Sequence, residues 1–249
     1  MIAGARVPEQ DEITHDTLLR GRVQLLQPRH GFRSSLDPVL LAGFIAPPFG
    51  HFLDIGCASG ALSFLLLALD PSARGVGAEI QPRLAALAKQ GAEANGFVDR
   101  FRVVTGDVRE QGAVVVQGFD LVATNPPFRP VGEGVLPPLS EKAMANHEVT
   151  LALSEWLDVS ASALRLDGRL ATIFPFDRWD ELRGELDTRG FVVARSREVV
   201  PRAGDVPNRI LVEAARSAVH ARIEPALVVH DGQGYSAEVR RMLGEEKRE

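Results

Sequence analysis

Four consecutive residues in this sequence could do chemistry directly. They are Asn125, Pro126, Pro127 and Phe128, which follow an apolar run at residues 120–124. An exocyclic amino nitrogen is a poor nucleophile because its lone pair is delocalised into a ring or a carbonyl group. The side-chain oxygen of Asn125 and the carbonyl oxygen of Pro126 could accept its two N–H groups and draw the nitrogen toward a tetrahedral geometry. The two prolines fix the backbone and Phe128 offers a stacking face, so the motif predicts group transfer to an amino nitrogen of a planar substrate.

A second set of residues with ligand chemistry lies at the ends of three apolar runs upstream. Gly56 and Gly60 follow the first run, Glu79 closes the second and Asp107 closes the third. Glycines let backbone amides approach a ligand at a helix N-terminus. Glu79 stands where a carboxylate could accept both ribose hydroxyls of a nucleoside, and Asp107 could accept an adenine amino group. Because the carboxyl ends of parallel strands meet at one edge of a sheet, we expect these residues to converge on one crevice.

Short strands that alternate with helices must position both sets. Strands are expected at residues 51–56, 75–80, 101–107, 119–124, 169–174, 191–200 and 209–214. Helices are expected at residues 37–45, 62–69, 82–95, 148–164 and 177–188. Asp37 is predicted as the N-cap of the first helix, and Asp167-Gly168 as the stop signal of the fourth. The alternation is typical of an α/β fold with a seven-stranded, mostly parallel sheet and helices on both faces.

The chain divides into three parts. Residues 1–50 form an N-terminal extension, residues 51–217 form the α/β domain, and residues 218–249 form a tail packed on the same domain. We expect the tail to hold a hairpin and a short helix.

Composition excludes some classes of protein. The formal net charge of -5 argues against a protein that coats nucleic acid through overall positive potential, although a local basic face remains compatible. Cys57 is the single cysteine, so we expect neither an intramolecular disulfide nor a cysteine metal cluster. We expect a reducing, cytoplasmic location. Residues 1–16 have no apolar signal-peptide core, and no apolar stretch approaches membrane-spanning length. We expect no membrane partner.

The crevice residues resemble the first three motifs of the class I S-adenosylmethionine-dependent methyltransferases. These motifs correspond to segment 54–60, which begins with Asp54, and to Glu79 and Asp107. The resemblance implies a Rossmann-like fold and S-adenosyl-L-methionine as the cofactor, with Asp54 and the glycine turn at its methionine part. The reactive methyl would be the cofactor's own, so no metal is expected. Ala58 replaces the usual middle glycine and would be strained at positive φ. A Rossmann dehydrogenase is the competing interpretation, but its three-glycine fingerprint is incomplete.

The Asn125 motif resembles that of methyltransferases that act on adenine N6, cytosine N4, guanine N2 or a glutamine amide. Residues 25–42 are similar to the N-terminal motif of the bacterial adenine-N6 methyltransferases that modify valine tRNA. This similarity implies that Arg33 and Asp37 lie over the cofactor and help to bind it. The Phe128-Arg129 pair extends the resemblance, and both residues are expected to bind substrate.

The resemblance leaves three hypotheses. Methylation of adenine N6 in tRNA is preferred, and methylation of guanine N2 in rRNA or of a protein glutamine amide is the alternative. A nucleoside-binding module without activity is the third, and the intact Asn-Pro-Pro-Phe motif argues against it.

An RNA partner requires local positive charge. Residues 17–36 contain four arginines, Arg20 and Arg22 among them, and no acid. Residues 189–222 contain a second excess of arginine. We expect both stretches to lie beside the crevice and Arg20 and Arg22 to contact RNA.

Overall fold

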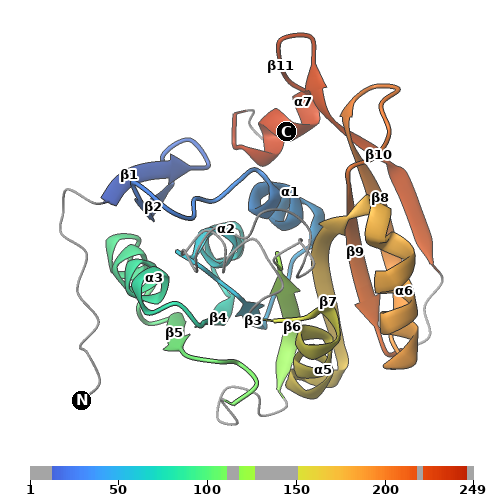
Figure 1. Cartoon of the computed structure of the whole chain (residues 1–249). Helices are drawn as coiled ribbons and strands as arrows, with labels where there is room; N and C mark the ends of the chain where they lie inside the picture. Colours follow the sequence, from blue (N-terminus) through green and yellow to red (C-terminus); the bar gives the residue numbers. More distant parts are fainter. Residues whose placement is uncertain (1–12, 111–117, 127–150, 218–220, 246–249) are drawn as a thin grey trace.

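A single large sheet forms the centre of the structure, a computed structural model that describes residues 13–110, 118–126, 151–217 and 221–245. Its strands are β3 (His51–Ile55), β4 (Arg74–Glu79), β5 (Phe101–Thr105), β6 (Phe119–Thr124), β7 (Leu164–Pro175), β8 (Val192–Arg202), β9 (Arg209–Ala215), β10 (Arg222–Asp231) and β11 (Gly234–Tyr235). Their order across the sheet is β11-β10-β8-β9-β7-β6-β3-β4-β5 (Figure 1).

The predicted α/β class is confirmed, and the strand count is corrected from seven to nine. β3 to β7 run parallel to one another, whereas β9 runs antiparallel to β7 and β8. The two additional strands belong to the tail. β10 pairs in parallel with β8 and forms a tight hairpin with β11, so the tail extends the main sheet.

Helices cover both faces of the sheet (Figure 1). They are α1 (Asp37–Phe44), α2 (Ala61–Leu69), α3 (Pro82–Ala94), α5 (Leu153–Ala163), α6 (Trp179–Thr188) and α7 (Ala237–Met242), with a 3-10 turn, η2 (Phe176–Arg178), before α6. Side chains alternate along a strand, so Phe52 of β3 packs in the apolar cluster of α1 and α2, and Leu53 packs in that of α5 and α6. No helix within the described ranges is long and apolar enough to span a membrane.

The predicted end of the fourth helix, at residue 164, agrees with the structure to within one residue, but its predicted stop signal is wrong. α5 ends at Ala163, and β7 begins at the next residue, so Asp167 and Gly168 lie within a strand. The register between β6 and β7 shifts here, and a Cβ on Gly168 would lie 2.8 Å from the carbonyl oxygen of Phe119. Gly168 therefore permits close approach of two backbones at an irregularity in the sheet, and does not stop a helix.

The N-terminal extension contains a hairpin that the sequence did not predict. β1 (Ile13–Leu18) and β2 (Val23–Pro28) pair antiparallel, and Leu26 of β2 packs on Leu84 and Leu87 of α3. The helix after this hairpin starts differently from the prediction, because its N-cap is Leu36 and no side chain caps it. Asp37 lies in the first turn of α1.

Candidate active site

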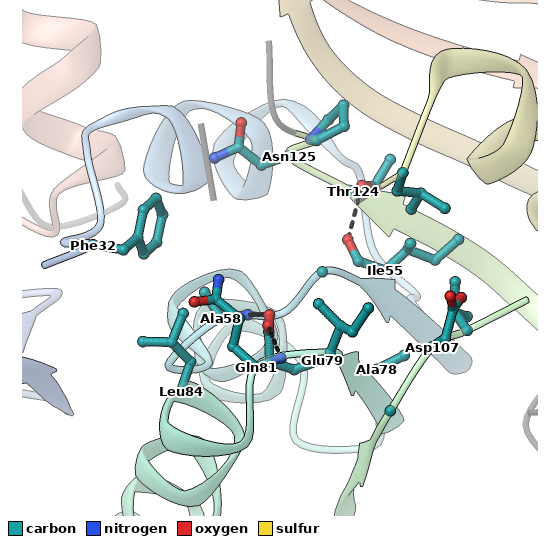
Figure 2. Close-up of a pocket in the computed structure, with 16 residues that line it drawn as sticks. Phe32, Ile55, Ala58, Ala78, Glu79, Gln81, Leu84, Asp107, Thr124 and Asn125 are labelled. Atoms are coloured by element: carbon teal, nitrogen blue, oxygen red, sulfur yellow. Dashed lines mark hydrogen bonds between the residues drawn. The ribbon is translucent and has the colours of Figure 1, made fainter. Parts of the chain in front are cut away.

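A cleft opens along the carboxyl ends of β3, β4, β5 and β6. It contains about 680 Å³ of space that is continuous with solvent. Figure 2 shows Phe32 and Asn125 on one side of this space and Glu79, Gln81 and Leu84 on the other. The cleft lies at the sheet edge where open α/β folds bind ligands, and a glycine turn and two acids that line it are groups that can bind a nucleoside-based cofactor.

The turn after β3 has left-handed backbone at Gly56, Ala58 and Gly60, with φ of 72°, 48° and 95°. Gly56 lines the cleft, and a Cβ built on it would meet nothing within 4 Å. That Cβ would occupy space available to a ligand. Gly60 is not among the described residues that line the cleft, and its Cβ would lie 2.5 Å from the ring of Phe64 in α2. Gly56 therefore leaves room for a ligand, whereas Gly60 allows the close approach of a helix.

The alanine at the centre of this turn is strained, as the sequence predicts for positive φ. The Ala58 amide donates a hydrogen bond of 2.9 Å to Oε2 of Glu79, which holds the residue in this conformation. We expect Ala58→Gly to raise the free energy of unfolding by about 1 kcal/mol, because glycine adopts left-handed backbone without a Cβ clash. Urea denaturation measures the change.

The matched control is Ala68→Gly, because Ala68 is a helical residue in the last turn of α2. It should lower the free energy of unfolding by roughly 1 kcal/mol. Equal destabilisation by both substitutions would show that Ala58 carries no strain.

Glu79 is a buried acid at the end of β4, with 5% of its surface exposed. Besides the amide of Ala58, it accepts the backbone amide of Gln81 at 2.7 Å, through Oε1. It also lines the cleft. One carboxylate thus shapes the glycine turn, fixes the start of α3 and faces the predicted ribose position.

Asp107 follows β5 and lines the same cleft. Its carboxylate is held by Arg109, whose Nε lies 2.9 Å from Oδ1. This hydrogen bond is the largest influence on Asp107 and keeps the pKa of its carboxyl below the usual value. The sequence analysis missed Arg109, because an arginine two positions after an acid is common on protein surfaces.

Asp54 lies in β3 beneath the glycine turn and is not among the described residues that line the cleft. Its Oδ2 accepts a hydrogen bond of 2.6 Å from the hydroxyl of Ser63 in α2. Burial raises the pKa of Asp54 to about 7, and the bond from Ser63 offsets only part of that rise. Direct contact between Asp54 and a ligand in the cleft is therefore not supported by its position.

The raised pKa of Asp54 predicts how the free energy of unfolding changes with pH. The folded protein holds the Asp54 proton more tightly than the unfolded chain, so this group costs stability as pH rises from about 4 through 7. We expect Asp54→Asn to be about as stable as wild type at pH 5. At pH 8 it should be more stable by about 2 kcal/mol, since the amide avoids the buried charge but leaves one N–H poorly satisfied.

Urea denaturation at the two pH values tests this expectation. Asp70→Asn is the control, because Asp70 accepts hydrogen bonds from Phe49 and Ser72 and should lose stability at both. A stability difference for Asp54→Asn that does not change between pH 5 and pH 8 would contradict the assigned ionisation.

The end of β6 carries the predicted catalytic loop. The hydroxyl of Thr124 donates to the carbonyl oxygen of Ile55 at 2.9 Å, which ties this strand end to the end of β3 (Figure 2). Asn125 and Pro126 line the cleft. The Oδ1 atom of Asn125 is buried and has no hydrogen-bond partner within the described residues. The rest of the predicted loop, Pro127, Phe128 and Arg129, lies outside the described residues.

The segment before α1 reaches the cleft through Phe32, which sequence reasoning did not single out, and not through Arg33 or Asp37. Arg33 donates to the hydroxyl of Thr14 at 2.7 Å and pairs with Asp16 at 2.8 Å, both on β1. The carboxylate of Asp37 lies 3.5 Å from Arg209 of β9, and burial raises its pKa. These contacts hold the segment before α1 in place, and the expected cofactor contacts of Arg33 and Asp37 stay predictions.

The expected position of Arg20 and Arg22 is wrong. Both lie at the turn between β1 and β2, and Arg22 donates to the carbonyl oxygen of Ala68 at 3.4 Å. Ala68 is near the C-terminal end of α2, whereas the cleft lies at the N-terminal end of this helix. The two arginines are separated from the cleft because the hairpin turn packs at the C-terminal ends of α2 and α3, where Arg22 reaches Ala68 and Gln24 bonds Asn95.

Comparisons with known proteins agree with this geometry. The sequence matches the family described as methyltransferase small domain over residues 37–174. A tRNA1(Val) (adenine(37)-N6)-methyltransferase from Porphyromonas gingivalis is 34% identical over 214 residues, which cover 82% of this chain and 83% of that protein. A protein of the same name from Mannheimia succiniciproducens is 24% identical and covers 81% of each chain.

Solved structures share the fold. A predicted O-methyltransferase from Agrobacterium tumefaciens superposes with a TM-score of 0.67 and 20% identity over 84% of this chain and 96% of that one. The Pyrococcus horikoshii protein TYW2 in complex with MeSAdo has a TM-score of 0.57 and 14% identity over 84% of this chain and 73% of its own. At these identities the likeness establishes the Rossmann-like fold alone.

Proposed function

The chain belongs to the methyltransferase small domain family, and we propose that it methylates the N6 nitrogen of an adenine in tRNA. It is an S-adenosyl-L-methionine-dependent methyltransferase, as family membership requires. The tRNA substrate is inferred from the names of its relatives, which cover most of the chain. The observation that carries the choice of an amino nitrogen is the buried Oδ1 of Asn125 at the cleft, which has no hydrogen-bond partner among the described residues.

The residues of the cleft fit S-adenosyl-L-methionine. The open space at Gly56 would admit the methionine part beside the glycine turn. Glu79 would accept the ribose hydroxyls and Asp107 the adenine amino group, because Glu79 ends β4 and Asp107 follows β5, and both line the cleft. When bound, this cofactor supplies an electrophilic methyl group.

Asn125 and Pro126 act on the methyl acceptor. A buried acceptor without a partner costs about 1–3 kcal/mol, which an incoming N–H group would recover. Asn125 Oδ1 accepts one N–H of the adenine amino group, and the Pro126 carbonyl oxygen accepts the other. Both bonds strengthen as the nitrogen gains positive charge during methylation, because its N–H groups become stronger donors, so they favour the transition state over the ground state.

Two arginines of the second basic stretch lie at the carboxyl edge of the sheet. Arg209 pairs in register with Pro175 at the end of β7, and Arg202 ends β8. Both have partners within the fold: Arg209 lies 3.5 Å from Asp37, and Arg202 donates to the carbonyl oxygen of Gly232 at 2.7 Å. Local charge is therefore only weak support for an RNA substrate, and the names of the relatives carry that choice.

The substrate class is tested with purified protein, S-adenosyl-L-methionine labelled in its methyl group, and a cell extract. We expect the label in the tRNA fraction, removable by ribonuclease. Label in ribosomal RNA would support the guanine N2 alternative, and label in protein would support the glutamine amide alternative. Either result would reject the tRNA proposal.

A further inference from the structure

The carboxylate of Asp107 accepts several hydrogen bonds from one residue, Arg109. Arg109 Nε donates to both carboxylate oxygens, at 2.9 Å to Oδ1 and 3.0 Å to Oδ2, its Nη2 donates to Oδ2, and its backbone amide donates to Oδ1 at 2.9 Å. A carboxylate has about four lone-pair sites, so these three donors leave room on Oδ2 for one more. Because the acid also lines the cleft, that remaining site is available to a ligand there.

Arg109 connects this acid to a second wall of the cleft. Its Nη1 donates to Oε1 of Glu155 at 2.6 Å, and Oε2 of Glu155 accepts the amide of Ala152 at 2.8 Å. Glu155 thereby caps the start of α5. Leu151, immediately before this helix, lines the cleft beside Asp107. The guanidinium therefore links the loop after β5 to the start of α5.

We propose that Arg109 is a positioning residue that sets the preference of the cleft for a 6-aminopurine nucleoside. It fixes the orientation of the Asp107 carboxylate, an acceptor-only group, so that the remaining lone-pair site of Oδ2 is presented to the ligand. A 6-amino group can donate to that site, whereas a 6-oxo group places an acceptor against an acceptor. This inference rests on the proposed placement of the adenine of the cofactor at Asp107, and it adds Arg109 and Glu155 as the groups that make the placement selective.

The test compares the binding of S-adenosylhomocysteine and S-inosylhomocysteine by calorimetry. Wild type should prefer the adenine compound by about tenfold or more. In Arg109→Met, affinity for the adenine compound should fall about tenfold while affinity for the inosine compound changes little, so the preference should nearly vanish. Arg109→Lys should restore part of it, and Asp107→Asn should favour the inosine compound because its amide can donate to a 6-oxo group.

Arg102→Met, at an exposed arginine on β5, the strand before Asp107, is the matched control and should leave both affinities unchanged. Thermal melting establishes that each variant is folded. A parallel loss of both affinities in Arg109→Met would mean that Arg109 only supports the loop. A gain in affinity for the adenine compound would mean that Arg109 competes with the ligand. Each result would overturn the proposal. Failure of wild type to bind S-adenosylhomocysteine would instead count against the proposed function.

Discussion

Asn125→Ala is expected to slow methyl transfer in a single turnover by about a hundredfold or more, the scale of removing one preorganised polar partner from a transition state. The side-chain oxygen that disappears is buried at the cleft and has no partner among the described residues. Thr124 still anchors the strand end and Pro126 still restricts the backbone, so the loop should keep its course. Affinity for S-adenosyl-L-methionine should stay within about threefold of wild type, because Glu79 and Asp107 are untouched.

Rapid-mixing assays at saturating cofactor measure this step. Asn125→Asp is the informative companion, since it keeps an acceptor oxygen at the same position and should retain part of the rate. Methyl transfer by Asn125→Ala within threefold of wild type, in a folded protein, would defeat the assigned mechanism even if the cofactor still bound.

Glu79→Ala is expected to weaken S-adenosyl-L-methionine binding by about a hundredfold, or roughly 3 kcal/mol, since hydrogen bonds to a charged group are worth about 1.5–3 kcal/mol each. The loss has two sources. The ribose hydroxyls lose their proposed acceptor, and the amides of Ala58 and Gln81 lose theirs, so the glycine turn is no longer held in shape.

Glu79→Gln separates these sources, because its amide oxygen can still accept one of the backbone amides. It should bind more tightly than Glu79→Ala and more weakly than wild type. Glu93→Ala, at an exposed acid of α3, is the control and should bind like wild type. Unchanged calorimetric affinity in Glu79→Ala would remove Glu79 from the cofactor site.

The strands that build the cleft were predictable because each is a short apolar run that ends at a residue with ligand chemistry. The run Phe119–Thr124 agrees with the prediction at both ends. Glu79 and Asp107 follow their strands closely, so parallel pairing brings them to one edge. These positions depend only on local pattern and on strand direction.

The N-terminal contacts were not predictable, because they depend on partners far away in sequence. Arg33 has the motif of a cofactor-covering residue, yet its guanidinium is satisfied by Thr14 and Asp16 on a hairpin that sequence reasoning missed. Arg20 and Arg22 lie in a basic stretch, but the direction of the hairpin decides that they reach the C-terminal end of α2 and not its N-terminal end at the cleft. The pattern of charges in the sequence shows that the stretch is basic, but it does not show toward which part of the fold the arginines point.

The measurement that tests the central claim most directly is nucleoside mass spectrometry on a tRNA1(Val) transcript after reaction with the protein and S-adenosyl-L-methionine. The relatives are named for adenine 37, so a transcript with guanine at that position is the control. We expect N6-methyladenosine in the adenine 37 transcript and none in the control. Methylation of both transcripts, formation of N2-methylguanosine, or no product under conditions in which S-adenosyl-L-methionine binds would contradict the account.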